Sequence, residues 1–159
     1  MLINSHRFGP LEIPENKIIS MARPVLGFEK LGRFCLIERE EFWPFLWMQS
    51  IEDPAVAFIV VNPVLFKSDY RIEINPNEIS ELEATTPELI ETYVIANVSD
   101  DWKLMTINLQ GPILINTSNN KAKQLVLMNS EYKVQQIVFE HEKITSTVTA
   151  KAAKEPVGV

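Results

Sequence analysis

A series of short apolar segments, each ended by proline, glycine or asparagine, most constrains what this chain can fold into. Residues 55–61 are the longest of them, and seven consecutive apolar residues ended by Asn62-Pro63 predict a central strand. Residues 69–75 alternate between apolar and polar positions, as a half-buried strand does. The other predicted strands are residues 34–37, 104–109, 113–116 and 124–129. Several short strands with turn residues between them predict a mainly β sandwich or barrel.

Helical patterns are few and short. Residues 77–83 predict two helical turns, with Asn77 as the N-cap and Ile79 and Leu82 on one face. A further turn is predicted over residues 87–91. For residues 132–139, strand periodicity and helical spacing both fit, so the sequence leaves the two open. The expected fold is therefore mainly β with a few short helices.

The length and the charge restrict the classes of function. A chain of 159 residues fits one domain, which we place over residues 1–143, followed by a tail over residues 144–159. A net charge of −6 argues against binding to a phosphate backbone. Residues 1–20 show no apolar export signal, and the longest apolar run is far shorter than the ~20 residues that cross a bilayer. We expect a soluble, cytoplasmic protein.

Acidic side chains are concentrated in one stretch of the chain. Residues 72–101 hold eight Asp and Glu residues and no Lys or Arg. Spread charges of this kind usually keep a surface soluble, so a solvated edge is one interpretation. An electrostatic docking site for a basic partner is the other. The sequence does not decide between them.

No combination of residues predicts a catalytic or metal site. Cys35 is the single cysteine, which excludes an internal disulfide, and neither His6 nor His141 lies in a motif that would activate it as a nucleophile. We expect Cys35 to pack in the interior. The three ligand types in residues 140–142 are consecutive and would point to opposite faces of a strand. No catalytic residue, metal or cofactor is therefore predicted.

Aromatic side chains crowd into residues 42–48, which read FWPFLWM. Consecutive positions of a strand cannot all face inward, so Trp47 is predicted to pack in the core and at least one of Phe42 and Trp43 to lie near the surface. Aromatic residues and Met are also typical of protein interfaces. Stacking on single-stranded nucleic acid would need a basic groove, whereas acidic residues flank this cluster.

Several stretches, in their order and spacing, resemble the bacterial flagellar assembly factor FliW family. The matching stretches are FGPLEI (residues 8–13), LGFE (26–29), PFLWMQSIEDPAVAFIVVNP (44–63), LFKSDYRIEI (65–74), MTINLQGPILIN (105–116) and KQLVLMNSEY (123–132). The resemblance covers roughly residues 6–140. The chain departs from the family pattern at residues 24–29, which lack one Gly and one Pro, and at Ser68 and Ala122, where the family commonly has Pro and Gly.

The resemblance implies a fold and a function. The fold is a mainly β, single-domain incomplete antiparallel β-barrel with a few short helices. The function is that of a regulator rather than an enzyme, monomeric when free and without a cofactor. FliW-like proteins bind the translational repressor CsrA away from its RNA site and antagonise it, and they also bind newly made flagellin, which competes with CsrA. The implied partners are these two proteins, with no direct contact to nucleic acid or membrane.

The resemblance also supplies candidate residues for partner binding. They are the motif positions Trp47, Gln49, Ser50, Asn62, Phe66, Asp69, Tyr70, Asn108, Leu109 and Asn116. Structural roles in capping, turns and packing explain the same residue types equally well. Asn108 is the stronger functional candidate, because a polar amide within an apolar segment could hydrogen-bond a partner's backbone by strand addition. Phe66, after the Asn62-Pro63 turn, is a candidate exposed anchor.

Two alternatives remain open at this stage. One is a small barrel enzyme whose pocket uses Glu38, Asp69 or His6. It requires a deep pocket with convergent polar groups, whereas a regulator requires a broad, shallow apolar patch. The other is a β-barrel that binds a small ligand in an empty interior, although the apolar segment 55–61 favours a filled one.

Overall fold

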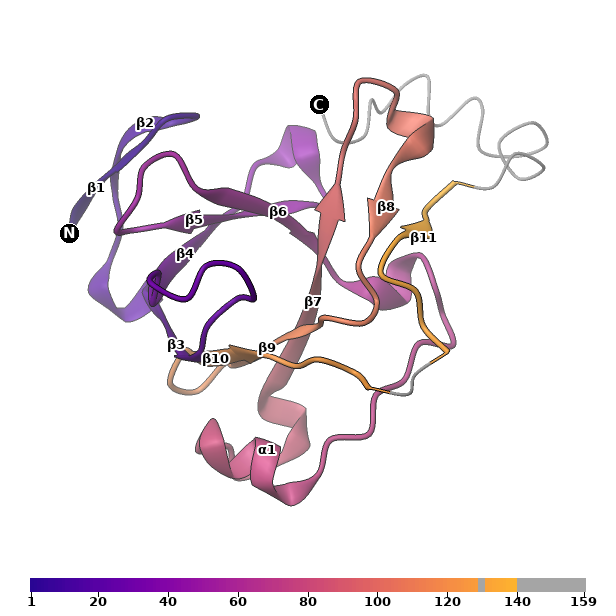
Figure 1. Cartoon of the computed structure of the whole chain (residues 1–159). Coiled ribbons are helices and arrows are strands. Elements are labelled where there is room, and N and C mark those ends of the chain that lie inside the picture. The colour runs from indigo at the N-terminus through magenta and orange to yellow at the C-terminus, as the bar shows by residue number, and fades with distance from the viewer. Residues whose placement is uncertain (129–130, 140–159) are drawn as a thin grey trace.

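A closed barrel of seven strands forms the body of the molecule (Figure 1). The computed structural model describes residues 1–128 and 131–139. Around the ring, neighbouring strands are β7 (Ile90–Asn97), β6 (Ala57–Val61), β5 (Leu46–Ser50), β4 (Arg33–Ile37), β3 (Ile19–Arg23), β10 (Lys121–Gln124) and β9 (Ile113–Asn116). The ring closes because β9 pairs with β7 again. All these pairs are antiparallel except β3 with β10, which is parallel.

The remaining elements are attached to this ring. Strands β8 (Thr106–Ile107) and β11 (Gln136–Ile137) extend the sheet from the end of β7, and β1 (Leu2–Ser5) pairs with β2 (Gly9–Glu12) in a separate hairpin. Among the described residues there is one α-helix, α1 (Pro76–Glu81), which lies below the barrel in the view of Figure 1. The 3-10 turns are η1 (Glu15–Lys17), η2 (Glu40–Phe42), η3 (Pro63–Leu65), η4 (Pro87–Leu89) and η5 (Trp102–Leu104). No helix in the described residues is long and apolar enough to cross a membrane.

Three clusters of apolar side chains hold the barrel and the attached elements together. The barrel interior is filled by side chains such as Phe34, Met48 and Val60. The β1–β2 hairpin covers a second cluster on the outer face of β4 and β5, made by Ile3, Cys35, Ile37 and Trp47. A third cluster lies under the loops that follow β6 and β8 and contains Phe45, Val61, Tyr70, Val94, Ala96, Met105, Ile107 and Leu109. Strand β6 is apolar on both faces because Val60 faces the interior and Val61 the third cluster.

The mainly β barrel with a few short helices is confirmed, and two details of the ring differ from what the resemblance implied. The ring is closed rather than incomplete, since one side of β7 pairs with β9 over Ile90–Tyr93 and with β8 over Ala96–Asn97. One pair of strands is parallel rather than antiparallel. Strands over residues 34–37, 55–61 and 113–116 are confirmed within one or two residues.

Other local predictions are wrong. Residues 69–75 form no strand, because their polar groups bond to side chains and turns instead of a ladder: the Arg71 amide donates to the Tyr132 hydroxyl. Strand β8 is much shorter than residues 104–109, since the Asp101 carboxylate accepts from the Lys103 amide and starts η5 there. The helix is capped by Asn75 rather than Asn77, with Pro76 in its first turn.

Two further differences concern strands near the C-terminus of the described chain. Strand β10 ends at Gln124, where the predicted strand 124–129 would begin. Within residues 132–139, the ambiguity between strand and helix resolves to the short strand β11. Strands β1, β2, β3, β5 and β7 were not among the predicted ones. Residues 140–142 and the predicted tail 144–159 lie outside the described residues.

Ion pairs fasten α1 to the barrel. Lys123 of β10 is buried, with 1% of its side chain exposed, and its ammonium pairs with the carboxylates of Glu78 and Glu81. Arg23 of β3 donates to both carboxylate oxygens of Glu81, at 2.9 and 2.6 Å. Lys121 pairs with Glu83. Three of the eight acidic residues in the stretch 72–101, Glu78, Glu81 and Glu83, therefore form ion pairs within the protein.

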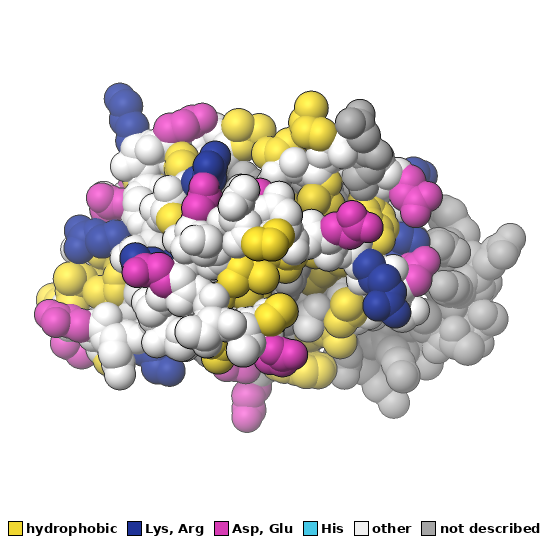
Figure 2. Space-filling view, turned by 90° about the horizontal axis from the view of Figure 1, so that it is seen from below, with side chains coloured by type: hydrophobic (Ala, Val, Ile, Leu, Met, Phe, Trp, Pro, Cys, Tyr) yellow, Lys and Arg dark blue, Asp and Glu magenta, His cyan; other side chains and the backbone are white. Residues whose placement is uncertain are grey.

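The surface near α1 agrees with this use of charge. Figure 2 shows acidic and basic side chains interspersed on the face seen from below, with hydrophobic side chains gathered between them. An uninterrupted acidic docking face is not present there. The acidic stretch therefore acts in part as an internal fastening between a helix and a sheet, which its sequence alone did not indicate.

We predict that this fastening depends on pH through Glu81. Hydrogen bonds from Arg23 and then Lys123 lower the pKa of Glu81 from its ordinary value of 4.5 to about 2. The carboxylate therefore stabilises the fold fully above about pH 4.5 and loses this effect as the pH falls toward about 2. The free energy of unfolding of the E81Q variant should lie below that of the unchanged protein at neutral pH, and the gap should close over this range.

Urea unfolding at a series of pH values measures this difference. The control is E88Q, which removes an exposed carboxylate that makes no ion pair among the described residues. The free energies of unfolding of E88Q and of the unchanged protein should differ little at every pH. A gap for E81Q that stays constant from pH 6 to pH 2 would contradict the role of the ionised carboxylate.

Candidate functional site

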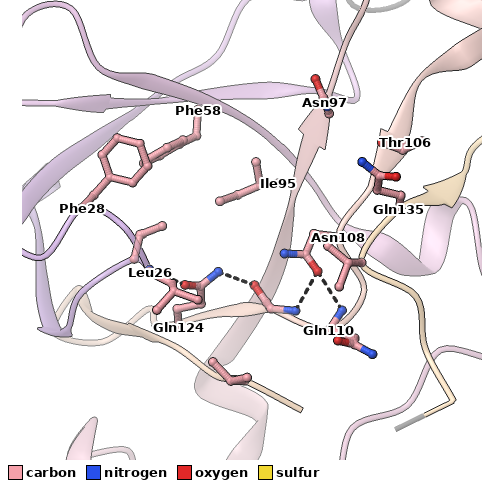
Figure 3. Close-up of a pocket in the computed structure, with 14 residues that line it drawn as sticks. Leu26, Phe28, Phe58, Ile95, Asn97, Thr106, Asn108, Gln110, Gln124 and Gln135 are labelled. Atoms are coloured by element: carbon pink, nitrogen blue, oxygen red, sulfur yellow. Dashed lines mark hydrogen bonds between the residues drawn. The ribbon is translucent and has the colours of Figure 1, made fainter. Parts of the chain in front are cut away.

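A groove of about 420 Å³ opens at one end of the barrel, beside the fork where β7 leaves β9 and meets β8 (Figure 3). Its floor continues the barrel interior, since Val25, Phe58 and Ile95 belong to that cluster or pack against it. Phe28 packs edge-to-face on Phe58, with ring centroids 4.8 Å apart. The groove is therefore an open, apolar depression supported by the core.

Exposed apolar side chains form the walls of the groove. Leu26 is 71% exposed, Val126 55% and Val134 54%. They come from the loop after β3, the segment after β10 and the segment before β11, so three parts of the chain meet here. Apolar side chains that stay exposed around a depression are typical of a surface that binds another molecule.

Neutral amide side chains supply the polar groups of the groove. The Asn108 side-chain oxygen accepts hydrogen bonds from the main-chain amides of Gln110 (3.0 Å) and Gly111 (3.1 Å). Gln124 donates to the Gly111 carbonyl (3.0 Å) and accepts from the Leu26 amide (2.7 Å). The amide nitrogen of Asn108 points away from its two bonds, toward the groove (Figure 3).

Gly111 permits the two amides to converge. A Cβ atom at this position would lie 2.8 Å from Nε2 of Gln124 and 2.9 Å from Nδ2 of Asn108, closer than real contacts allow. A larger residue would have to displace one or both amide groups. Gly111, which lies between β8 and β9, is therefore part of the groove.

Of the ten candidate residues, Asn108 is the one that lines the groove. The side-chain oxygen of Asn108 holds the turn between β8 and β9, so only its amide nitrogen faces the groove and is left for the predicted contact with a partner. Phe66 is half-buried, and its ring stacks on Phe45 with centroids 5.7 Å apart. Phe66 is thus anchored in the third cluster and does not stand free.

Asn62 and Asp69 are exposed and have local partners. Asn62 caps η3, since its side-chain oxygen accepts from the Val64 amide at 3.2 Å. Asp69 pairs with Lys67 at 3.3 Å. Both side chains remain accessible, together with the exposed Leu65 between them in sequence. This loop is the second accessible surface that contains motif residues.

The other six candidates are buried: Trp47, Gln49, Ser50, Tyr70, Leu109 and Asn116. Gln49 and Ser50 hold the turn between β5 and β6. The Gln49 amide donates to the Val56 carbonyl at 3.1 Å, and the Ser50 hydroxyl accepts from the amide of Asp53 at 3.0 Å. The side-chain oxygen of Gln49 is buried and has no hydrogen-bond partner among the described residues.

The aromatic and asparagine candidates among the six also support the fold. Trp47 packs under the hairpin, and the Arg7 guanidinium lies 4.2 Å from its ring centroid. The Asn116 amide donates to the Leu82 carbonyl at 2.8 Å and so holds the end of α1. Tyr70 donates through its hydroxyl to the Leu109 carbonyl at 2.7 Å, and burial raises the pKa of Tyr70.

The aromatic segment and Cys35 behave as predicted. Trp47 is buried, whereas Trp43 is 66% exposed. Phe42 packs edge-to-face on Trp47, with centroids 5.9 Å apart. Cys35 is buried in the same cluster, and this burial raises the pKa of its thiol. A raised pKa disfavours the thiolate that nucleophilic attack requires.

The residues proposed for an enzyme do not converge. Glu38 lines a separate hollow together with Glu91 and Tyr93, and neither His6 nor Asp69 lines that hollow. The barrel interior is occupied by side chains, which removes the space that an enclosed small ligand would need. Within residues 1–128 and 131–139, no group of three or more His, Cys, Asp or Glu could hold a metal ion.

We predict that the Tyr70 hydroxyl stabilises the fold and makes no contact with a partner. The substitution Tyr70→Phe leaves the buried Leu109 carbonyl without this donor and should lower the free energy of unfolding by about 1–2 kcal/mol. Tyr93→Phe is the control, because that hydroxyl donates to the exposed Glu91 carboxylate. Urea unfolding measures both variants. Unchanged stability together with weakened partner binding would contradict this assignment.

Comparison with known proteins places the chain in a family. The family described as "FliW protein" matches residues 2–138. A flagellar assembly factor FliW from Syntrophus aciditrophicus is 37% identical over 143 residues, covering 90% of each chain. One from Clostridium beijerinckii is 39% identical over 128 residues, covering 80% of this chain and 91% of the relative.

A solved structure agrees with the sequence comparison. A crystal structure of the flagellar assembly factor FliW superposes with a TM-score of 0.84 at 31% identity, and the match covers 89% of this chain and 99% of that chain. The match of one family over nearly all the described residues and the shared fold lead to one conclusion. This chain belongs to the FliW family of flagellar assembly factors.

Proposed function

We propose that this protein is a non-enzymatic flagellar assembly factor that works in the cytoplasm by binding two proteins, CsrA and flagellin. Bound to CsrA away from its RNA site, it relieves repression of flagellin translation. Newly made flagellin competes for the same factor and releases CsrA, so that translation follows export. The observation that carries this proposal is the family match over residues 2–138.

The shape and chemistry of the surface support a binding function. The groove is open, apolar on its floor and lined by amides, and these features suit the binding of a protein segment better than catalysis. The candidate catalytic groups do not share a pocket in the described structure. A protein that exchanges partners needs a surface with different affinities for each of them, and it needs no reacting group.

Partner contact is proposed for the four motif residues that reach the surface. Asn108 offers its amide nitrogen at the groove, and Asn62, Phe66 and Asp69 border the loop that follows β6. The six buried motif residues hold these surfaces in place. Their substitution should therefore act on binding through stability.

The first test is calorimetric titration of the full chain with CsrA and, separately, with flagellin from the same organism. Saturable binding to both partners, with one displacing the other, supports the proposal. Binding to flagellin alone would leave an assembly role and remove direct control of translation. No binding to either partner would overturn the proposal.

We predict that Asn108→Asp weakens partner binding at least tenfold without unfolding the protein. The aspartate keeps an oxygen acceptor for the Gln110 and Gly111 amides, but it removes the N–H donor and adds a negative charge at the groove. Titration measures the affinity, and thermal unfolding measures stability.

The matched control is Asn75→Asp. Asn75 caps α1 through its side-chain oxygen, away from the groove-lining residues, and aspartate can cap equally well. The control should change neither affinity nor stability by much. Unchanged affinity for both partners in folded N108D would exclude the Asn108 amide from the binding surface.

A further inference from the structure

The groove contains an open strand edge. After β10, the chain continues in extended form along the turn between β8 and β9. The Leu125 amide donates to the Pro112 carbonyl and the Leu127 amide to the Gln110 carbonyl, each at 2.8 Å. Successive main-chain amides of an extended segment point in opposite directions. The Val126 amide therefore points to the opposite side, toward the loop after β3.

No strand occupies that opposite side. The parallel pairing of β3 with β10 ends at Arg23 and Lys123, where its register shifts. The loop then turns away through Gly27, whose φ of +91° favours glycine. Among the described residues, no hydrogen bond joins the Val126 amide to any acceptor, and Val126 is 55% exposed.

A side chain bridges the start of this gap. The Gln124 side-chain oxygen accepts from the Leu26 amide at 2.7 Å, where a continuing ladder would have used a main-chain carbonyl. Figure 3 shows Gln124 between the Leu26 loop and the turn that carries Asn108. Beyond this bridge, the Val126 edge and the Asn108 amide nitrogen both remain available at the groove.

The lining of the groove defines what can enter. Fourteen residues line it, and none of them is charged, although 23% of the residues in the chain are. A charged side chain brought into the groove would lose water without gaining an ionic partner. Phe28, Phe58 and Ile95 offer apolar contacts to alternate side chains of an extended segment.

We propose that the groove binds an extended peptide segment without charged side chains by strand addition to the Val126 edge. The main chain of the peptide pairs with residues 124–128, and one face of it packs on the apolar floor. The inference deepens the proposed function, because it names the form in which a partner chain is held.

The test uses the full chain labelled with ¹⁵N and the capped peptide Ac-Gly-Thr-Val-Thr-Val-Thr-Gly-NH₂. Amide chemical shifts of Leu26, Gly111 and Val126 should move in a saturable way. Two further peptides carry N-methyl groups, one on both valines and the other on the three threonines. Because an added strand uses amides of one parity only, one of these peptides should retain binding and the other should lose at least tenfold.

Variants test the chemistry of the lining. Val126→Lys places a charge at the open edge and should weaken peptide binding at least tenfold. Leu2→Lys is the control, because Leu2 of β1 is 67% exposed and does not line the groove. A peptide with lysine in place of the first valine should also bind at least tenfold more weakly. Dispersed amide spectra confirm that both protein variants are folded.

Two results would overturn the inference: absent or scattered shift changes up to millimolar peptide, or equal loss of binding by both methylated peptides. Failure of the proposed function is separate. If the peptide binds the groove while CsrA and flagellin do not bind the protein, the inference stands and the function fails. If both proteins bind V126K as tightly as the unchanged chain and the peptide does not bind, the function stands and the inference fails.

Discussion

The pairing of β7 on both of its sides is the constraint on which the structure depends. One side pairs with β6, and the other side pairs first with β9 and then with β8. Its first four residues close the ring, so that each of the seven strands has a neighbour on both sides and the ring encloses a core of side chains such as Phe34 and Met48. The hairpin, the helix and the loops are then added to the outer face of a ring that is already complete.

The groove follows from the same fork. Because β8 and β9 pair with β7 in succession, the residues between them must leave the ladder, and their main-chain groups need other partners. Asn108 and Gln124 supply them, with Gly111 leaving the space. These two side chains take up the hydrogen bonds of main-chain groups that have left the sheet, and they lie close to the place where a further strand could pair. The residues that stabilise the fork are therefore also the residues that shape the groove.

The parts of the fold that local patterns could predict are those with continuous apolar runs. Residues 113–116 are buried on both faces, residues 57–61 are buried or half-buried on both, and the composition of each segment indicates this. Local patterns do not predict strand β7, because it begins with half-buried and polar positions and changes partner halfway. Residues 69–75 alternate well, yet alternation reports which side chains are buried and not whether a neighbouring strand exists. Tyr70 is buried there by a bond to Leu109, 39 residues away.

The candidate site was predictable only in part for a related reason. Asparagine, glutamine and serine recur in motifs both when they bind a partner and when they hold turns, and Gln49, Ser50 and Asn116 do the latter. What distinguishes Asn108 from these three residues is its position at the groove, which the structure alone reveals. An uncharged groove that pairs with the main chain of a peptide discriminates weakly among uncharged side chains, so two partners could compete for it by presenting similar extended segments without charges. Exchange by competition at such a site requires no change in the barrel, which agrees with a ring closed on itself.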